Sequence, residues 1–159
     1  MKPILYLDLD DTILNGGMPV HNSQAFFEWV VTHFEMRWLT AWIPSGIMDD
    51  YQANVLSQRF GGKIPPTEFQ KYNNPMPIER EDERGGSSYH KTNGIDFTET
   101  RPWAWVENRP SSVEGFILLQ SGMSHKFYLT DLRENDPHAI DNPIAKTWAK
   151  LRKDFNINE

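Results

Sequence analysis

The first apolar segment of the chain reads Ile4-Leu5-Tyr6-Leu7-Asp8-Leu9-Asp10-Asp11-Thr12-Ile13-Leu14. A short apolar run of this kind predicts a buried strand, and the acids stand at its carboxyl end. In an open parallel α/β sheet, ligands bind at that edge. Nucleophilic aspartates form aspartyl-phosphates in phosphoryl transfer. An acidic turn or helix cap is the competing interpretation, but the strand before Asp8 and the hydroxyl of Thr12 after it favour a reactive site.

The composition is that of one globular domain spanning residues 1–159. The chain is long enough to bury a sizeable core, with 38% hydrophobic residues and six tryptophans. The lack of cysteine excludes a disulfide scaffold and thiolate metal sites and fits a reducing compartment, so we expect a cytoplasmic protein. The first apolar run is too short for a signal peptide, and no run approaches the roughly 18 residues of a membrane span. A net charge of -6 argues against general nucleic-acid binding.

Helices are predicted where apolar residues recur at helical spacing. The first follows the cap candidates at residues 21–23, and the second covers residues 49–60 and ends at Gly61-Gly62. The third covers residues 143–155, with Ile144, Trp148 and Leu151 on one face. These helices alternate with apolar runs that predict further strands.

The further strands are predicted at residues 36–42, 101–106, 115–120 and 126–130. Alternating strands and helices indicate an α/β fold with a doubly wound parallel sheet. Residues 63–90 differ, because they are rich in proline and glycine, carry a charge run at 79–84 and show little hydrophobic periodicity. This pattern predicts a polar surface excursion, either a plain solvated loop or a functional lid.

Polar side chains also mark the ends of the other strands. Thr40 follows the Trp-Leu run, Lys91 precedes the strand at 101–106, and Glu107 ends that strand. Transfer of a phosphoryl group needs donors and cations fixed around its oxygens. A hydroxyl, an ammonium group and carboxylates supply these, and carboxylate oxygens are ligands that Mg²⁺ accepts. Each residue also has an ordinary interpretation, Thr40 as a helix cap and Lys91 as a solvated lysine.

The segment Asp8-Leu9-Asp10-Asp11-Thr12 resembles the first motif of the haloacid dehalogenase (HAD) superfamily, Asp-x-Asp-x-Thr/Val after a hydrophobic strand. The resemblance implies that Asp8 attacks phosphorus and that Asp10 acts as general acid and base. It also implies that Asp8 and the backbone carbonyl of Asp10 help to hold Mg²⁺. Thr12 would support the turn after the strand, and Asp11 has no fixed role.

Three further segments resemble later motifs of the same superfamily, in the correct order. They are Trp38-Leu39-Thr40-Ala41-Trp42 for the second motif, Lys91 for the third, and Arg101-Pro102-Trp103-Ala104-Trp105-Val106-Glu107-Asn108 for the fourth. Lys63 and Lys71 compete with Lys91 for the third motif. The fourth motif departs from the usual acidic pair, since Glu107 is followed by the neutral Asn108. Glu107 is therefore the expected third metal ligand.

Together these resemblances imply a small HAD-like three-layer α/β domain without a full cap. The expected function is Mg²⁺-dependent hydrolysis of phosphate monoesters, with Asp8, Asp10, Thr40 and Lys91 as catalytic residues. An open site suits a phosphorylated small molecule or an exposed phosphorylated macromolecule. The alternative, favoured by Asn108, is a catalytically weak or inactive HAD-like module that binds a phosphorylated ligand or a protein partner. No oligomeric state follows from the sequence.

Overall fold

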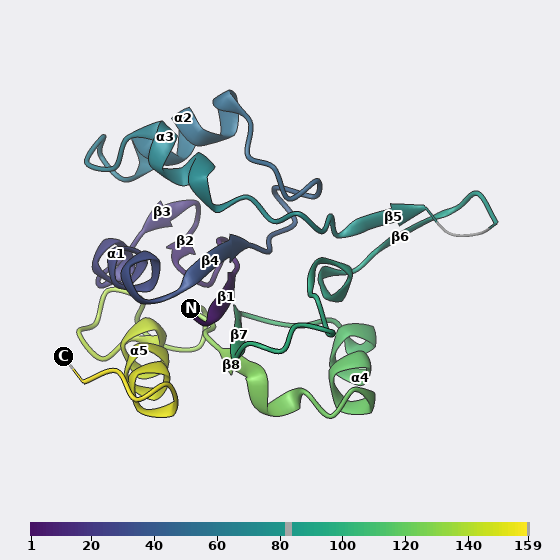
Figure 1. Ribbon diagram of the computed structural model, residues 1–159. Coiled ribbons are helices and arrows are strands. Elements are labelled where there is room, and N and C mark those ends of the chain that lie inside the picture. The colour runs from purple at the N-terminus through teal and green to yellow at the C-terminus, as the bar shows by residue number, and fades with distance from the viewer. Residues whose placement is uncertain (82–83, 159) are drawn as a thin grey trace.

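Four parallel strands form the central sheet, in the spatial order β4-β1-β7-β8 (Figure 1). They cover β1 (Ile4–Leu7), β4 (Glu35–Trp38), β7 (Trp103–Glu107) and β8 (Phe127–Leu129). The computed structural model describes residues 1–81 and 84–158, so Asp82 and Glu83 of the charge run lie outside the described residues. Strands predicted near 4–7, 36–42, 101–106 and 126–130 are confirmed, although β4 ends four residues before Trp42.

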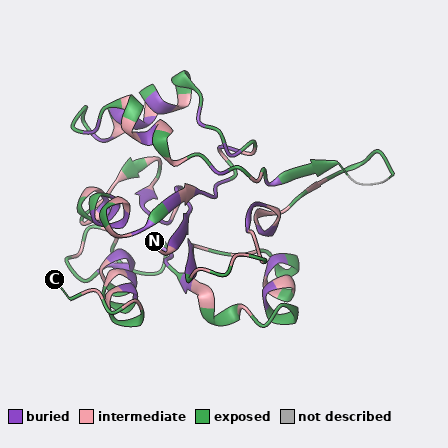
Figure 2. Cartoon of the chain, viewed as in Figure 1, coloured by how far each residue is buried: buried purple, intermediate pink, exposed green. Residues whose placement is uncertain are grey.

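Successive side chains of a strand point to opposite faces of the sheet. Because the central strands are apolar at successive positions, both faces of the sheet are apolar. Figure 2 shows the two inner strands, β1 and β7, as buried at the centre of the molecule, whereas the outer strands β4 and β8 are partly exposed. One face belongs to a large core that includes Leu5, Leu7, Ala104 and Val106. The other face belongs to a smaller core that includes Ile4, Tyr6, Trp103 and Trp105.

Helices pack against both faces of the sheet (Figure 1). Helices α1 (Ser23–His33) and α5 (Pro143–Asp154) share the larger core, where the ring of Trp148 lies 5.8 Å from Phe26 and 5.7 Å from Trp29. Helix α4 (Ser112–Gln120) reaches the smaller core through Leu118. The result is an α/β fold with a parallel sheet, as the alternating pattern predicted. No helix in the described ranges is both long and apolar enough to cross a membrane.

The strand predicted at residues 115–120 is wrong, because these residues belong to α4. A capping box starts the helix: Ser111 Oγ accepts from Glu114 N (3.2 Å), and Glu114 Oε1 accepts from Ser111 N (2.8 Å). The run Gly-Phe-Ile-Leu-Leu-Gln resembles a buried strand, but Phe116 and Leu119 are exposed. The capping signal at Ser111 and Glu114 should have outweighed the apolar run.

The chain between β4 and β7 begins with helix α2 (Asp50–Arg59), which Asp49 caps and which matches the predicted second helix. The segment expected as a polar excursion then forms α3 (Pro66–Phe69), the single turn η1 (Gln70–Tyr72) and an exposed hairpin of β5 (Glu79–Glu81) and β6 (Ser87–Tyr89). It also contributes to the core. Phe69 is fully buried, and its carbonyl accepts a hydrogen bond from the Trp38 indole (2.8 Å).

The remaining elements are short. The β2 (Leu14–Asn15) and β3 (Met18–Pro19) strands form a small hairpin directly after the first acidic segment. The single turns η2 (Lys91–Gly94) and η3 (Ser124–Lys126) precede β7 and β8, respectively.

Candidate active site

The register of the sheet brings three of the predicted residues to one edge. Leu7 of β1 lies opposite Val106 of β7 and Trp38 of β4, so Asp8, Glu107 and Thr40 follow at the carboxyl ends of neighbouring strands. The Asp8 amide donates to the Val106 carbonyl (3.1 Å), which continues the pairing beyond β1. Asp8, Thr40 and Glu107 are all buried. This is the edge at which parallel α/β sheets bind their ligands.

The side chain of Lys91 connects two of these carboxylates. Its Nζ donates to Asp8 Oδ1 at 3.0 Å and to Glu107 Oε2. Burial lowers the pKa of Lys91, but the charges of Asp8 and Glu107 outweigh burial and raise it overall, so the ammonium stays protonated. The competing lysines lie elsewhere, since Lys63 is exposed and Lys71 pairs with Glu68. The structure therefore brings Lys91 to Asp8.

Glu107 is completely buried at the end of β7. Its Oε1 accepts hydrogen bonds from the amides of Asn108 (3.0 Å) and Arg109 (3.4 Å). Burial and the neighbouring charge of Asp8 raise the pKa of Glu107 to about 8, against the opposing effect of Lys91. Two buried carboxyl groups share one ammonium group here, so the site disfavours a second negative charge and Glu107 retains a proton at neutral pH.

The second oxygen of Asp8 is held by Thr12. The hydroxyl of Thr12 donates to Asp8 Oδ2 at 2.9 Å, so both carboxylate oxygens have a fixed partner. The turn between Asp8 and Thr12 is tight. Asp11 has a φ of 57, and the amides of Thr12 (3.2 Å) and Leu14 (3.0 Å) both donate to the Leu9 carbonyl. The predicted support of the turn by Thr12 thus includes a direct contact with Asp8.

Asp10 lies on the solvent side of the same turn and is exposed. Burial of part of its carboxyl raises the pKa of Asp10, and the charge of Asp8 raises it further, whereas Arg59 and Lys91 oppose these effects. A carboxyl group with a raised pKa is better able to hold a proton, as a general acid must. Asp11 Oδ2 lies 3.8 Å from Nε of Arg133.

Thr40 is almost fully buried in the loop after β4. Its Oγ1 accepts a hydrogen bond from the Trp42 amide (3.3 Å), and its carbonyl accepts from the Ile43 amide (3.1 Å). These contacts fix the turn. Neither contact uses the hydroxyl proton of Thr40, which has no acceptor among the described residues and can be donated to a ligand at the sheet edge.

Two residues that the sequence analysis did not select support the site. The carboxylate of Glu114, buried at the start of α4, accepts a hydrogen bond from the Lys91 amide and so fixes the backbone of Lys91. The Tyr89 hydroxyl of the hairpin donates to the Ala41 carbonyl (2.8 Å), next to Thr40. The capping box at Ser111 and Glu114 was visible in the sequence, whereas the Tyr89 contact depends on the path of the hairpin.

A third such residue follows β8 by two positions. Asp131 is buried at the same sheet edge, where its carboxylate pairs with Arg133 (2.8 Å). The hydrogen bonds to Arg133 hold the pKa of Asp131 below its usual value. The rule that found Asp8 and Glu107, a polar residue after a strand, would also have found Asp131.

The residues expected to hold Mg²⁺ are Asp8, Glu107 and the Asp10 carbonyl. Within residues 1–81 and 84–158 there is no cluster of three or more His, Asp or Glu side chains that could hold a metal ion. The two buried carboxyl groups of Asp8 and Glu107 nevertheless place oxygen atoms on both sides of a single ammonium group, and a cation there would offset the charge repulsion that raises the pKa of Glu107. This donor set fits Mg²⁺, which uses few protein carboxylates and completes its shell with water and phosphate.

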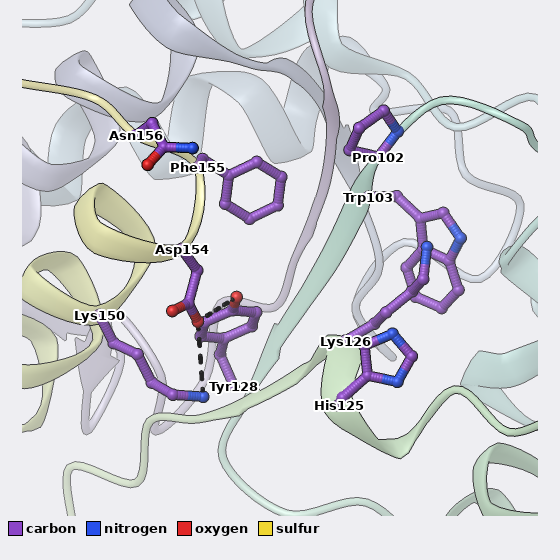
Figure 3. A pocket seen from close by; sticks show the side chains of 9 residues that line it. All are labelled: Pro102, Trp103, His125, Lys126, Tyr128, Lys150, Asp154, Phe155 and Asn156. Carbon is purple, nitrogen blue, oxygen red and sulfur yellow. Dashed lines mark hydrogen bonds and ion pairs between the residues drawn. The ribbon is translucent and has the colours of Figure 1, made fainter.

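A separate cavity of about 760 Å³ lies at the other end of the sheet (Figure 3). It is lined by Pro102, Trp103, His125, Lys126, Tyr128, Lys150, Asp154, Phe155 and Asn156. Pro102 and His125 precede β7 and β8, so this cavity opens at the amino ends of the strands. It therefore contains none of the residues gathered around Asp8.

Comparisons with known proteins found no match to this chain among family models, curated proteins or solved structures.

Proposed function

We propose that this protein hydrolyses phosphate monoesters through an aspartyl-phosphate on Asp8, with the support of Mg²⁺. The observation that carries the proposal is the position of Lys91, whose ammonium group bonds to both Asp8 and Glu107. A nucleophilic carboxylate must be held in one orientation while its repulsion from the phosphate is reduced. Lys91 and Thr12 together meet both requirements, because each holds one oxygen of Asp8.

The proposed chemistry has two steps. In the first, an Asp8 oxygen forms a bond to phosphorus as the bond to the leaving-group oxygen breaks, and Asp10 gives its proton to that oxygen. In the second, Asp10 takes a proton from water, whose oxygen attacks phosphorus and releases Asp8 and inorganic phosphate. The Thr40 hydroxyl donates to a phosphoryl oxygen in both steps.

The metal site of this proposal uses carboxylate oxygens of Asp8 and Glu107 and the carbonyl of Asp10. When bound, Mg²⁺ supplies positive charge that offsets the charge of the transferring phosphoryl group. The two buried carboxyl groups at Asp8 and Glu107 support this assignment, because a cation bound there would offset the repulsion that raises the pKa of Glu107. Asn108 adds no charge, so affinity for Mg²⁺ without substrate is expected to be weak.

The strand order and the order of the four motifs support a HAD-like three-layer domain without a cap. The acidic residues after β1, the threonine after β4 and the glutamate at the end of β7 stand at one edge. We propose a phosphorylated small molecule or an exposed phosphorylated group of a macromolecule as substrate. The alternative function, a binding module on the same fold, keeps the contacts of Lys91 but lacks turnover.

A phosphatase assay tests the proposal. The purified protein is expected to hydrolyse an aryl phosphate in Mg²⁺ and to lose this activity in EDTA. Asp8→Asn should abolish turnover, whereas Asp141→Asn, an exposed aspartate on another loop, serves as the matched control. Trapping with hydroxylamine should detect an acyl phosphate in the wild type alone. Activity that survives Asp8→Asn would overturn the mechanism, and absence of turnover with retained phosphate binding would favour the binding module.

A further inference from the structure

Arg59 is a half-buried arginine near the candidate site that the proposed chemistry does not use. It lies in the last turn of α2, and its guanidinium carbon is 5.5 Å from the centre of the Trp42 ring. Trp42 follows Thr40 in the loop after β4. The side chain of Arg59 therefore contacts the loop that holds Thr40, whose Oγ1 accepts a hydrogen bond from the Trp42 amide.

The other neighbour of the Arg59 guanidinium is Gly17, in the turn of the β2–β3 hairpin. A Cβ atom added to Gly17 would lie 3.4 Å from Cζ of Arg59 and 3.6 Å from each terminal nitrogen. Nearly equal distances to these three atoms mean that Gly17 sits over the flat face of the guanidinium. Glycine also suits this turn because φ at Gly17 is 80. Gly17 and Trp42 thus hold Arg59 by apolar and ring contacts, which leave the N–H groups free.

The N–H groups of Arg59 have no protein acceptor in the described ranges, where its contact is with the Trp42 ring. A guanidinium carries five donors in a rigid fork that matches a carboxylate or a phosphate. Stacking against Trp42 fixes the plane of that fork without using its donors. An arginine held in this way is preorganised for an anionic ligand.

The position of Arg59 relative to Asp10 indicates which part of a substrate it meets. The Arg59 guanidinium lies against Gly17 of the β2–β3 hairpin, which directly follows the acidic segment that contains Asp10. The hairpin under Arg59 begins at Leu14, which is bridged to Asp10. In the proposed mechanism Asp10 protonates the leaving-group oxygen, whereas Lys91 and Thr12 face the nucleophile. Arg59 therefore lies on the leaving-group side of the reacting phosphorus.

We infer that Arg59 is a specificity-determining residue that binds a second anionic group on the leaving group of the substrate. The preferred substrates are then phosphate monoesters whose alcohol carries a carboxylate or another phosphate. This inference rests on the proposed phosphatase function of the same site. A neutral leaving group would leave the half-buried Arg59 without a partner, which is how a polar site rejects an incorrect ligand.

The test uses phosphate monoesters of ω-hydroxy carboxylic acids of increasing chain length, each paired with its neutral primary amide. For the wild type, kcat/KM should favour the acid over the amide by about tenfold to hundredfold at the chain length that reaches Arg59. Arg59→Met should reduce this ratio to near one, mainly through KM of the acid. Arg59→Lys keeps the charge but not the planar fork and should retain only part of the preference.

Arg152→Met in α5 is the matched control, since it removes an arginine outside the site and should leave the ratio unchanged. Two results overturn the inference: a wild type without preference for any acid, or equal losses on acids and amides in Arg59→Met. Equal losses would assign Arg59 to the transferring phosphoryl group.

Binding of the same acids and amides to Asp8→Asn, measured by calorimetry in Mg²⁺, separates the two hypotheses. If no ester is hydrolysed, the proposed function fails. The inference would still be supported if Asp8→Asn binds the acids more tightly than the amides and the double variant Asp8→Asn/Arg59→Met loses this difference. Equal binding of acids and amides to Asp8→Asn would reject it.

Discussion

Lys91 Nζ lies 3.0 Å from Asp8 Oδ1, although 83 residues separate the two positions in the sequence. The contact depends on two independent supports. The β1–β7 pairing places Asp8 beside Glu107, and the buried carboxylate of Glu114 holds the amide of Lys91. The strand pairing and the hydrogen bond to Glu114 together fix the ammonium group of Lys91 at the sheet edge, so Lys91 is not simply a solvated lysine.

Lys91→Met should abolish phosphatase activity and also destabilise the protein. Removal of one partner from a buried ion pair costs about 3–5 kcal/mol, and we expect about 3 kcal/mol because Glu107 can take up a proton. Urea unfolding at neutral pH measures this loss. The double variant Lys91→Met/Glu107→Gln should recover part of the stability but none of the activity. A single variant as stable as the wild type would mean that the ammonium group is not paired in solution.

Mg²⁺ binding should depend on Glu107 and improve with a second acid. Glu107→Gln is expected to weaken binding, and Asn108→Asp to tighten it by adding a carboxylate beside the first. Calorimetric titration of the three proteins with MgCl₂ compares their dissociation constants. If Glu107→Gln binds Mg²⁺ as tightly as the wild type and stays active, the metal is held by other residues.

Asp10→Asn should affect substrates according to their leaving groups. Because general acid catalysis contributes about 10²–10⁴-fold, the loss should be large for alkyl phosphates and small for activated aryl phosphates. Single-turnover kinetics with both substrates measures formation of the intermediate. The same loss on both substrates, with phosphorylation limiting the rate, would make Asp10 a structural residue only.

Thr12→Val should lower kcat more than it raises KM. The substitution keeps the β-branched shape but removes the hydrogen bond to Asp8 Oδ2, which is worth about 1.5–3 kcal/mol to a charged acceptor. A loss of roughly tenfold to hundredfold in kcat is therefore expected, and Thr12→Ser should restore most of it. Full activity in Thr12→Val would show that Lys91 alone orients the nucleophile.

The sequence was most informative where local pattern and burial agree. The strands near Asp8 and Glu107 were predictable because each is a short apolar run that ends in an acid. The strand proposed at 115–120 was wrong because α4 shows an apolar surface on several sides, so periodicity favoured the incorrect element over the cap at Ser111. The role of Arg59 could not be predicted, since its contacts with Trp42 and Gly17 join segments that only the tertiary fold brings together.

The residues around Lys91 also bear on how this protein would respond to selection. Asp8 and Glu107 are two buried carboxyl groups with one ammonium group between them, and the raised pKa of Glu107 reflects the repulsion that arises when both are charged. Substitutions that neutralise either carboxylate relieve this repulsion. A laboratory screen for heat resistance alone would therefore enrich inactive variants at these two positions. A screen that also requires turnover would instead select stabilising substitutions elsewhere, such as at the distant α1–α5 contact.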